Sequence, residues 1–117
     1  MARSNSNSEP PALTPAMHHI LLALLEGERH GYAIMQGVEA LTAGATRLGP
    51  GTLYTSIRKL LDGGLIEESG ERPDVDDERR RYYRLSKAGR EAVRAETERL
   101  ARLVRYARSH SRFGVAL

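Results

Sequence analysis

Apolar residues recur at helical spacing in three segments of the first half of the chain. The first segment runs from Pro15 to about Glu26 and follows Thr14, a residue typical of an N-cap, with proline at the first helical position. A second helix is expected to begin near His30–Gly31, with apolar content as far as Leu41. The small residues 42–49 predict a loop, and a third helix is expected over residues 50–62.

The second half begins with two short β-compatible runs, residues 65–69 and 82–85. The polar stretch 70–81 between them predicts the loop of a long β-hairpin. Ser86 then has the position of an N-cap for a final helix that reaches about Ser109. The predicted order is helix, helix, helix, hairpin, helix.

This order is the plan of a winged helix-turn-helix, a mainly α fold with a small β-hairpin. The third helix of that fold enters the DNA major groove, and the hairpin, called the wing, lies along the neighbouring backbone. We expect a disordered tail over residues 1–12, a winged-helix DNA-binding domain over 13–85, a C-terminal dimerisation helix over 86–110 and a tail over 111–117.

The third helix is expected to present polar side chains opposite its apolar face, which is formed by Leu53, Ile57, Leu60 and Leu61. The candidate base-reading residues are Thr52, Thr55 and Lys59. Tyr54 and Arg58 lie at the margin, where the sugar-phosphate backbone would run, although Tyr54 could instead be half-buried beside Leu61. The candidate wing contacts are Arg72, Arg79, Arg80 and Arg81. The alternative is that the acidic residues between 74 and 78 neutralise these arginines in a solvated loop.

The final helix carries a narrow apolar stripe flanked by arginine. Its members are Val93, Leu100, Leu103, Val104 and Ala107. The stripe could pack on the first helix, but a chain of 117 residues gains stability by completing its core in a dimer. A homodimer would also present two recognition helices about one DNA turn apart.

Charge is distributed unevenly along the chain. Residues 1–78 hold six basic and twelve acidic side chains, and residues 79–117 hold twelve basic and three acidic ones. Sixteen of the 18 basic residues are arginine, which suits bidentate contacts with phosphate. This asymmetry indicates an anionic partner without identifying it, and the winged helix-turn-helix plan makes double-stranded DNA the expected one.

Composition excludes several other classes. Cysteine is absent, so disulfides and thiolate ligands are excluded, and no apolar run is long enough to span a membrane. We therefore expect a cytoplasmic protein with no membrane partner. The histidines lack metal-ligand spacing, and no nucleophile–base pair or phosphate-binding glycine pattern is present. The chain is predicted to be neither an enzyme nor a cofactor or metal binder.

Three stretches carry a resemblance that covers residues 13–93. They are HGYAIMQGV, GPGTLYTSIRKLLDGGLIEES and RRRYYRLSKAGREAV, and together they resemble the PadR family of bacterial transcriptional regulators. The single C-terminal helix is similar to the compact branch of that family. The resemblance implies a homodimeric repressor whose last helix supplies dimer contacts. Some relatives bind flat aromatic ligands with the help of tryptophan, which this chain lacks.

Residues of the second predicted helix are expected to be mainly structural. Gly31 would permit a close approach, and Tyr32 would bury its ring. An effector acting at the dimer interface is expected to release the operator. The alternatives are a winged-helix module that binds another protein, and a small-molecule sensor that does not bind DNA. Steep salt dependence of binding would distinguish DNA contacts from protein contacts.

Overall fold

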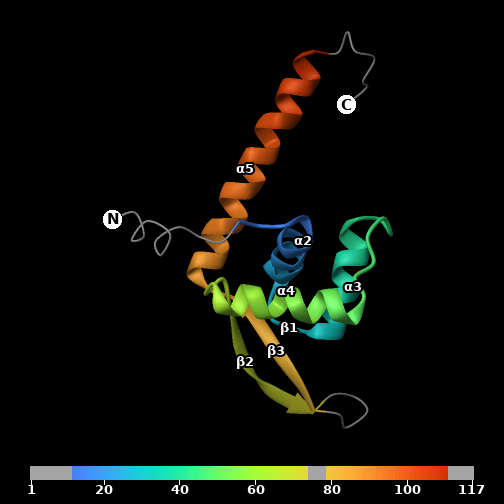
Figure 1. Ribbon diagram of the computed structural model, residues 1–117, viewed down its shortest axis with the longest axis vertical. Coiled ribbons are helices and arrows are strands. Elements are labelled where there is room, and N and C mark those ends of the chain that lie inside the picture. The colour runs from blue at the N-terminus through green and yellow to red at the C-terminus, as the bar shows by residue number, and fades with distance from the viewer. Residues whose placement is uncertain (1–11, 74–78, 111–117) are drawn as a thin grey trace.

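The computed structural model describes residues 12–73 and 79–110 (Figure 1). The predicted tails, 1–12 and 111–117, fall outside these ranges except for residue 12. The elements in chain order are α2 (Pro15–Ala23), the 3-10 turn η1 (Leu24–Glu26), β1 (Arg29–His30), α3 (Gly31–Leu41), α4 (Pro50–Asp62), β2 (Ile66–Pro73), β3 (Arg79–Leu85) and α5 (Lys87–Ser109). The mainly helical winged helix-turn-helix architecture predicted from the sequence is confirmed.

Side-chain caps explain where three of the helices begin. The Thr14 hydroxyl accepts a hydrogen bond from the amide of Met17, and the Ser86 hydroxyl accepts one from the amide of Gly89. At the start of α3, Nδ1 of His30 accepts a hydrogen bond from the amide of Ala33. Each cap satisfies an amide that has no partner within its own helix, so these helix starts are encoded locally.

The sheet differs from the predicted hairpin in two ways. It has three antiparallel strands in the order β1-β3-β2, because the two-residue strand β1 pairs with β3. The strands also extend into the stretch 70–81 that was predicted to be loop, since β2 continues to Pro73 and β3 begins at Arg79. A bulge between Glu68 and Gly70 shifts the register of β2, and Gly70 there has a φ of 132°. Charged residues pair across these strands, which is why hydropathy did not reveal the full strand length.

One hydrophobic core joins the helices to the sheet. Its most deeply buried side chains are Ile20, Leu21, Leu24, Ile34, Val38, Leu53, Leu60 and Leu65. Tyr83 and Leu85 of β3 close it from the sheet side, and Val93 closes it from the base of α5. The buried faces of α2, α3 and α4 therefore converge on one point, which fixes the orientation of α4 on the surface.

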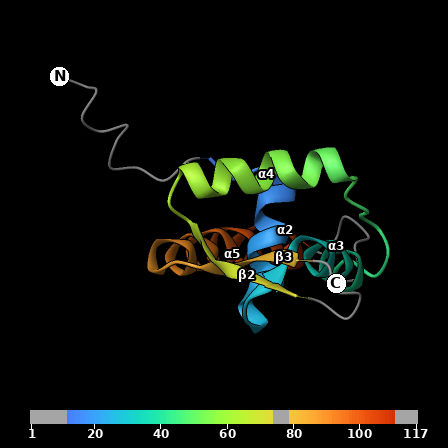
Figure 2. The same ribbon diagram turned by 90° about the horizontal axis from the view of Figure 1, so that it is seen from below.

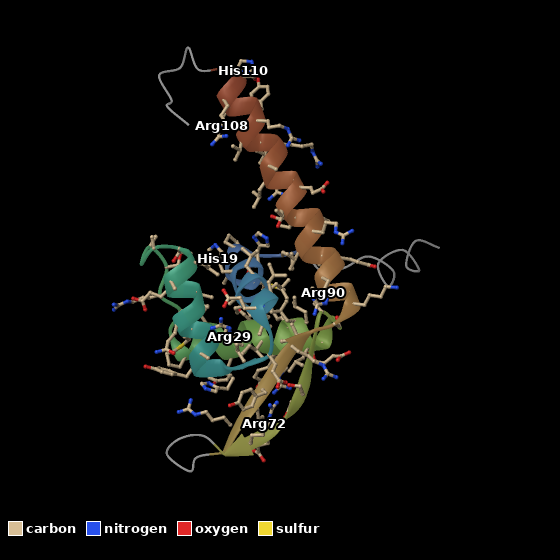
Figure 3. All side chains as sticks on the ribbon, turned by 180° about the vertical axis from the view of Figure 1, so that it is seen from behind. His19, Arg29, Arg72, Arg90, Arg108 and His110 are labelled. Atoms are coloured by element: carbon tan, nitrogen blue, oxygen red, sulfur yellow. The ribbon has the colours of Figure 1, made fainter. Side chains whose placement is uncertain are left out.

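Helix α5 leaves this body and projects away from it (Figure 1). Figure 3 shows Arg108 and His110 at its far end, well separated from the sheet. Within the described ranges, no helix is long and apolar enough to cross a membrane.

Candidate nucleic-acid interface

Helix α4 lies along one side of the molecule (Figure 2), and its polar face is exposed to solvent. Its buried residues are Leu53, Ser56, Ile57 and Leu60. All five candidate residues are exposed, namely Thr52, Tyr54, Thr55, Arg58 and Lys59. The apolar face anchors the helix on the core, so the polar side chains point outward with a fixed orientation.

Two cations on this face are available for a partner. Arg58 and Lys59 form no ion pair within the part of the chain that the structure describes. By contrast, Arg47 pairs with Glu39 at 3.2 Å and Arg84 pairs with Glu67 at 3.1 Å. The recognition face is therefore locally cationic, although the first 78 residues are acidic overall.

Tyr54 rests against the first residue of α3. A Cβ atom at Gly31 would collide with the Tyr54 hydroxyl, so only glycine admits the ring in this position. The expected close approach at Gly31 is thus confirmed. The expectation for Tyr32 is wrong, since half of Tyr32 is exposed. Its ring lies at the surface, with Cζ of Arg80 5.8 Å from the ring centre.

A hollow of about 320 Å³ lies between the start of α3, helix α4 and the wing. It is lined by His30, Gly31, Tyr54, Glu71, Arg80, Arg81 and Tyr83. Tyr83 is 5% exposed, and burial raises the pKa of its phenol, so this group stays protonated at neutral pH. Two arginines and two tyrosines give the hollow several hydrogen-bond donors suited to an oxyanion, against the single carboxylate of Glu71.

The wing arginines have different surroundings. Arg81 lies across from Glu68, with 3.7 Å between Nε and Oε2, and its side chain is largely exposed. Arg80 lines the same hollow and contacts the Tyr32 ring. The side chain of Arg79 lies outside the described residues, although its backbone belongs to β3. The structure brings Arg80 and Arg81 close to the margin of α4, where the sequence predicts phosphate contacts.

Arg72 lies in an ion pair that the sequence did not reveal. Its Nη1 and Nη2 donate to the two carboxylate oxygens of Glu28 at 2.6 and 2.9 Å. The Ser69 hydroxyl donates to the same carboxylate at 2.7 Å, and the guanidinium stacks 4.0 Å from the centre of the Tyr82 ring. Figure 3 shows Arg72 on the wing. Glu28 is 44 residues away in sequence, so no local pattern could have identified this partner.

The hydrogen bond from Arg72, followed by that from Ser69, lowers the pKa of Glu28 to about 2. A carboxyl group whose pKa is lowered in the folded state stabilises that state above its unfolded pKa of about 4.5. This contribution is lost as the pH falls from about 4.5 through 2. We therefore expect wild type to unfold at higher urea concentration than Glu28→Gln at pH 6, and the difference to vanish near pH 2. An unchanged difference across this range would contradict the assigned ion pair.

The apolar stripe of α5 divides into two parts. Val93 is 5% exposed and belongs to the core of its own chain, so its expected place at a dimer contact is corrected. Farther along the helix, Leu103 is 55% and Val104 44% exposed, with Leu100 and Ala107 beside them. Tyr106, which is not among the predicted dimer residues, is 66% exposed and stacks on His110. The outer half of α5 therefore carries large apolar side chains that the described part of its own chain leaves exposed.

Comparison with known proteins agrees with this geometry. Residues 20–95 match the model of the transcriptional regulator PadR-like family. A transcriptional regulator of Mycobacterium tuberculosis is 38% identical over 96 residues, which cover 80% of this chain and 85% of that protein. An uncharacterized 37.1 kDa protein in a transposon of Streptomyces fradiae is 38% identical over 84 residues; these span 72% of this chain but only 22% of that protein.

A solved structure shares the fold. Bacillus subtilis PadR in complex with operator DNA superimposes with a TM-score of 0.64 at 20% identity, over 74% of this chain and 48% of that one. The family is a non-enzymatic one, in agreement with the prediction that the chain is not an enzyme. On the strength of the family match and the Mycobacterium relative, this chain belongs to the PadR-like family of transcriptional regulators.

Proposed function

We propose that this chain binds double-stranded DNA sequence-specifically as a homodimer and represses transcription. The observation that carries the proposal is the exposed face of α4, which bears Arg58 and Lys59 and lies beside a donor-lined hollow. The operator complex of Bacillus subtilis PadR, a protein with the same fold, supports a DNA ligand for this surface.

Helix α4 enters the major groove in this proposal. Thr52 and Thr55 offer short hydroxyl groups to base edges, and Lys59 offers a longer donor that suits the acceptors of guanine. Arg58 lies at the margin of the same face and contacts phosphate. The buried side of α4 holds these groups at a constant depth in the groove.

The wing binds the adjacent backbone. A phosphate binds in the hollow beside Tyr54, which Arg80 and Arg81 both line, and Arg79, whose side chain lies outside the described residues, is a further candidate for this contact. The Tyr54 hydroxyl is held against Gly31, so it donates to that phosphate without a conformational search. Phosphate contacts of this kind set the register of the protein on the duplex, while α4 provides the discrimination between sequences.

Dimerisation uses the outer part of α5. Leu100, Leu103, Val104 and Ala107 form a stripe that a second copy would cover, which removes an exposed apolar surface. The dimer places two α4 helices on successive major-groove faces of a pseudo-palindromic operator. A small-molecule effector that binds at this interface changes the separation of the two helices and thereby releases the operator.

The test is fluorescence anisotropy with the DNA that flanks the gene of this protein, compared with random DNA of equal length. We expect specific binding whose affinity falls about a thousandfold or more between roughly 50 and 200 mM salt, through counterion release. Absence of binding at low salt would overturn the proposal. Binding to both DNAs with equal affinity would overturn its sequence-specific part.

The base-reading role has its own test. Thr55→Ala combined with Lys59→Ala is expected to reduce the preference for operator over random DNA by about tenfold or more, because each base contact contributes about 1–3 kcal/mol of discrimination. Glu39→Gln, on α3, provides a control outside the α4 face. An unchanged preference in the double variant would remove both residues from base readout.

A further inference from the structure

Glu28 connects two parts of the molecule that are distant in sequence. It lies between η1 and β1, in the connection from α2 to α3, while its partners Ser69 and Arg72 lie on β2 of the wing. Three hydrogen bonds of 2.6 to 2.9 Å converge on its carboxylate. Such a charge-assisted, bidentate arrangement restrains orientation more than a single contact does.

The bulge in β2 makes this convergence geometrically accessible. Ser69 occupies the register shift between Glu68 and Gly70, and the positive φ of Gly70 follows it directly. The shift allows Ser69 to reach the same carboxylate as Arg72, three residues farther along the strand. Bulges commonly redirect a side chain in this way, and this one joins the wing to the helical body.

Aromatic rings complete the contact on the same side of the sheet. Arg72 stacks on Tyr82, whose ring meets the edge of the His30 ring with 5.4 Å between centroids. His30 also caps α3, the helix on which the Tyr54 ring rests. The wing strand is thus linked through Glu28, Tyr82 and His30 to the helix start that seats Tyr54.

We propose that Glu28 is a positioning residue of the wing: its carboxylate holds Arg72 and Ser69 and thereby sets the angle between the wing and α4 that DNA binding requires. This inference rests on the DNA-binding function proposed above. Arg72 then acts through Glu28 and not as a phosphate contact of its own, and the direct wing contacts belong to Arg79, Arg80 and Arg81.

If Glu28 positions the wing, its substitution changes DNA affinity in the opposite direction to that expected from charge alone. Removing an acidic residue and releasing an arginine near DNA should strengthen binding if only charge mattered. If Glu28 positions the wing, the same substitution weakens binding, because the wing must then be ordered when it meets the backbone. Weaker DNA binding by Glu28→Gln therefore indicates positioning of the wing, and stronger binding indicates an effect of charge alone.

The first experiment needs no DNA. Hydrogen exchange of the β2 amides 66–72 is measured by mass spectrometry in wild type, Glu28→Gln and Glu26→Gln. Glu26 is a matched control, since it pairs at 2.7 Å with Arg29 within its own segment. We expect β2 exchange to accelerate about tenfold in Glu28→Gln only, with α4 unchanged, as in local opening. Equal β2 protection in all three proteins would overturn the positioning role.

The second experiment measures operator affinity for Glu28→Gln, Arg72→Gln and the double variant. We expect each to bind about tenfold more weakly than wild type with an unchanged salt slope, because the wing must be ordered on binding while no phosphate contact is lost. The double variant should match the single variants, because both act through one contact. Glu26→Gln should bind like wild type or slightly more tightly.

Three results would overturn the inference: unchanged or tighter binding by Glu28→Gln, a loss in Glu26→Gln equal to that in Glu28→Gln, or losses that add in the double variant. Losses of affinity that add in the double variant would indicate that Arg72 contacts DNA directly. If wild type binds no DNA at low salt, the proposed function fails, and the exchange measurement still decides whether Glu28 orders the wing.

Discussion

Replacing Leu103 and Val104 by glutamate should convert the proposed dimer into a folded monomer with operator affinity at least about 100-fold weaker. These side chains are 55% and 44% exposed on the outer half of α5, so their own chain does not need them to fold. In a dimer the exposed half of each side chain would contribute about 1 kcal/mol of hydrophobic burial, once from each protomer. Loss of the dimer removes the linked second half-site, which is worth about 10²–10⁴ in apparent affinity.

Sedimentation velocity and circular dichroism would measure the oligomeric state and the helix content of this variant. Arg105→Glu provides a control one position farther along the helix, away from the apolar stripe. We expect the control to remain dimeric. A wild type that is monomeric at micromolar concentration, or a Leu103→Glu/Val104→Glu protein that remains a dimer, would contradict dimerisation through α5.

Replacing Gly89 by alanine should destabilise the fold by about 3 kcal/mol or more, as expected when a well-packed site is overfilled. Gly89 is buried in the first turn of α5, and a Cβ atom there would collide with the carbonyl oxygen of Leu65. That carbonyl already accepts a hydrogen bond from the Ser86 amide at 3.1 Å. Because the obstacle is backbone, no side-chain rotation relieves the overlap.

Urea unfolding followed by circular dichroism would measure this loss. Gly51→Ala is a matched control, since Gly51 lies in the first turn of α4 and a Cβ atom added there would meet no atom within 4 Å among the described residues. We expect the control to change stability by no more than about 1 kcal/mol, in the stabilising direction given by helix propensity. Equal urea midpoints for Gly89→Ala and Gly51→Ala would contradict the tight packing at the start of α5.

Locally encoded features were predictable from the sequence. Thr14, His30 and Ser86 each cap the helix that follows, and their hydrogen bonds span only three residues. The exposed and buried sides of α4 also followed from its 3.6-residue period. The candidate recognition face was therefore predictable from the sequence alone, because one helix contains all of it.

Features that depend on distant partners were not predictable. Strand β1 has two polar residues and is a strand only because β3 lies beside it. Arg72 has the sequence position of a wing contact, but its partner Glu28 lies 44 residues away. The helical period of α5 identified an apolar stripe, but it could not show which of its residues pack on the chain's own core. Val93 was therefore predicted to be a dimer contact, whereas it lies in the core. In each case the missing information was a contact between residues that are distant in sequence.

The attachment of α5 at one end gives this helix the mechanics of a lever. Its base is held where the Ser86 hydroxyl donates to the Gly64 carbonyl at 2.6 Å and the Ser86 amide donates to the Leu65 carbonyl. With 23 residues, α5 is about 34 Å long, so a tilt of about 5° at the base displaces its far end by about 3 Å. Because Val93 packs in the core near this base, such a tilt requires that packing to shift slightly, and the far end of α5 then moves by about one base-pair step.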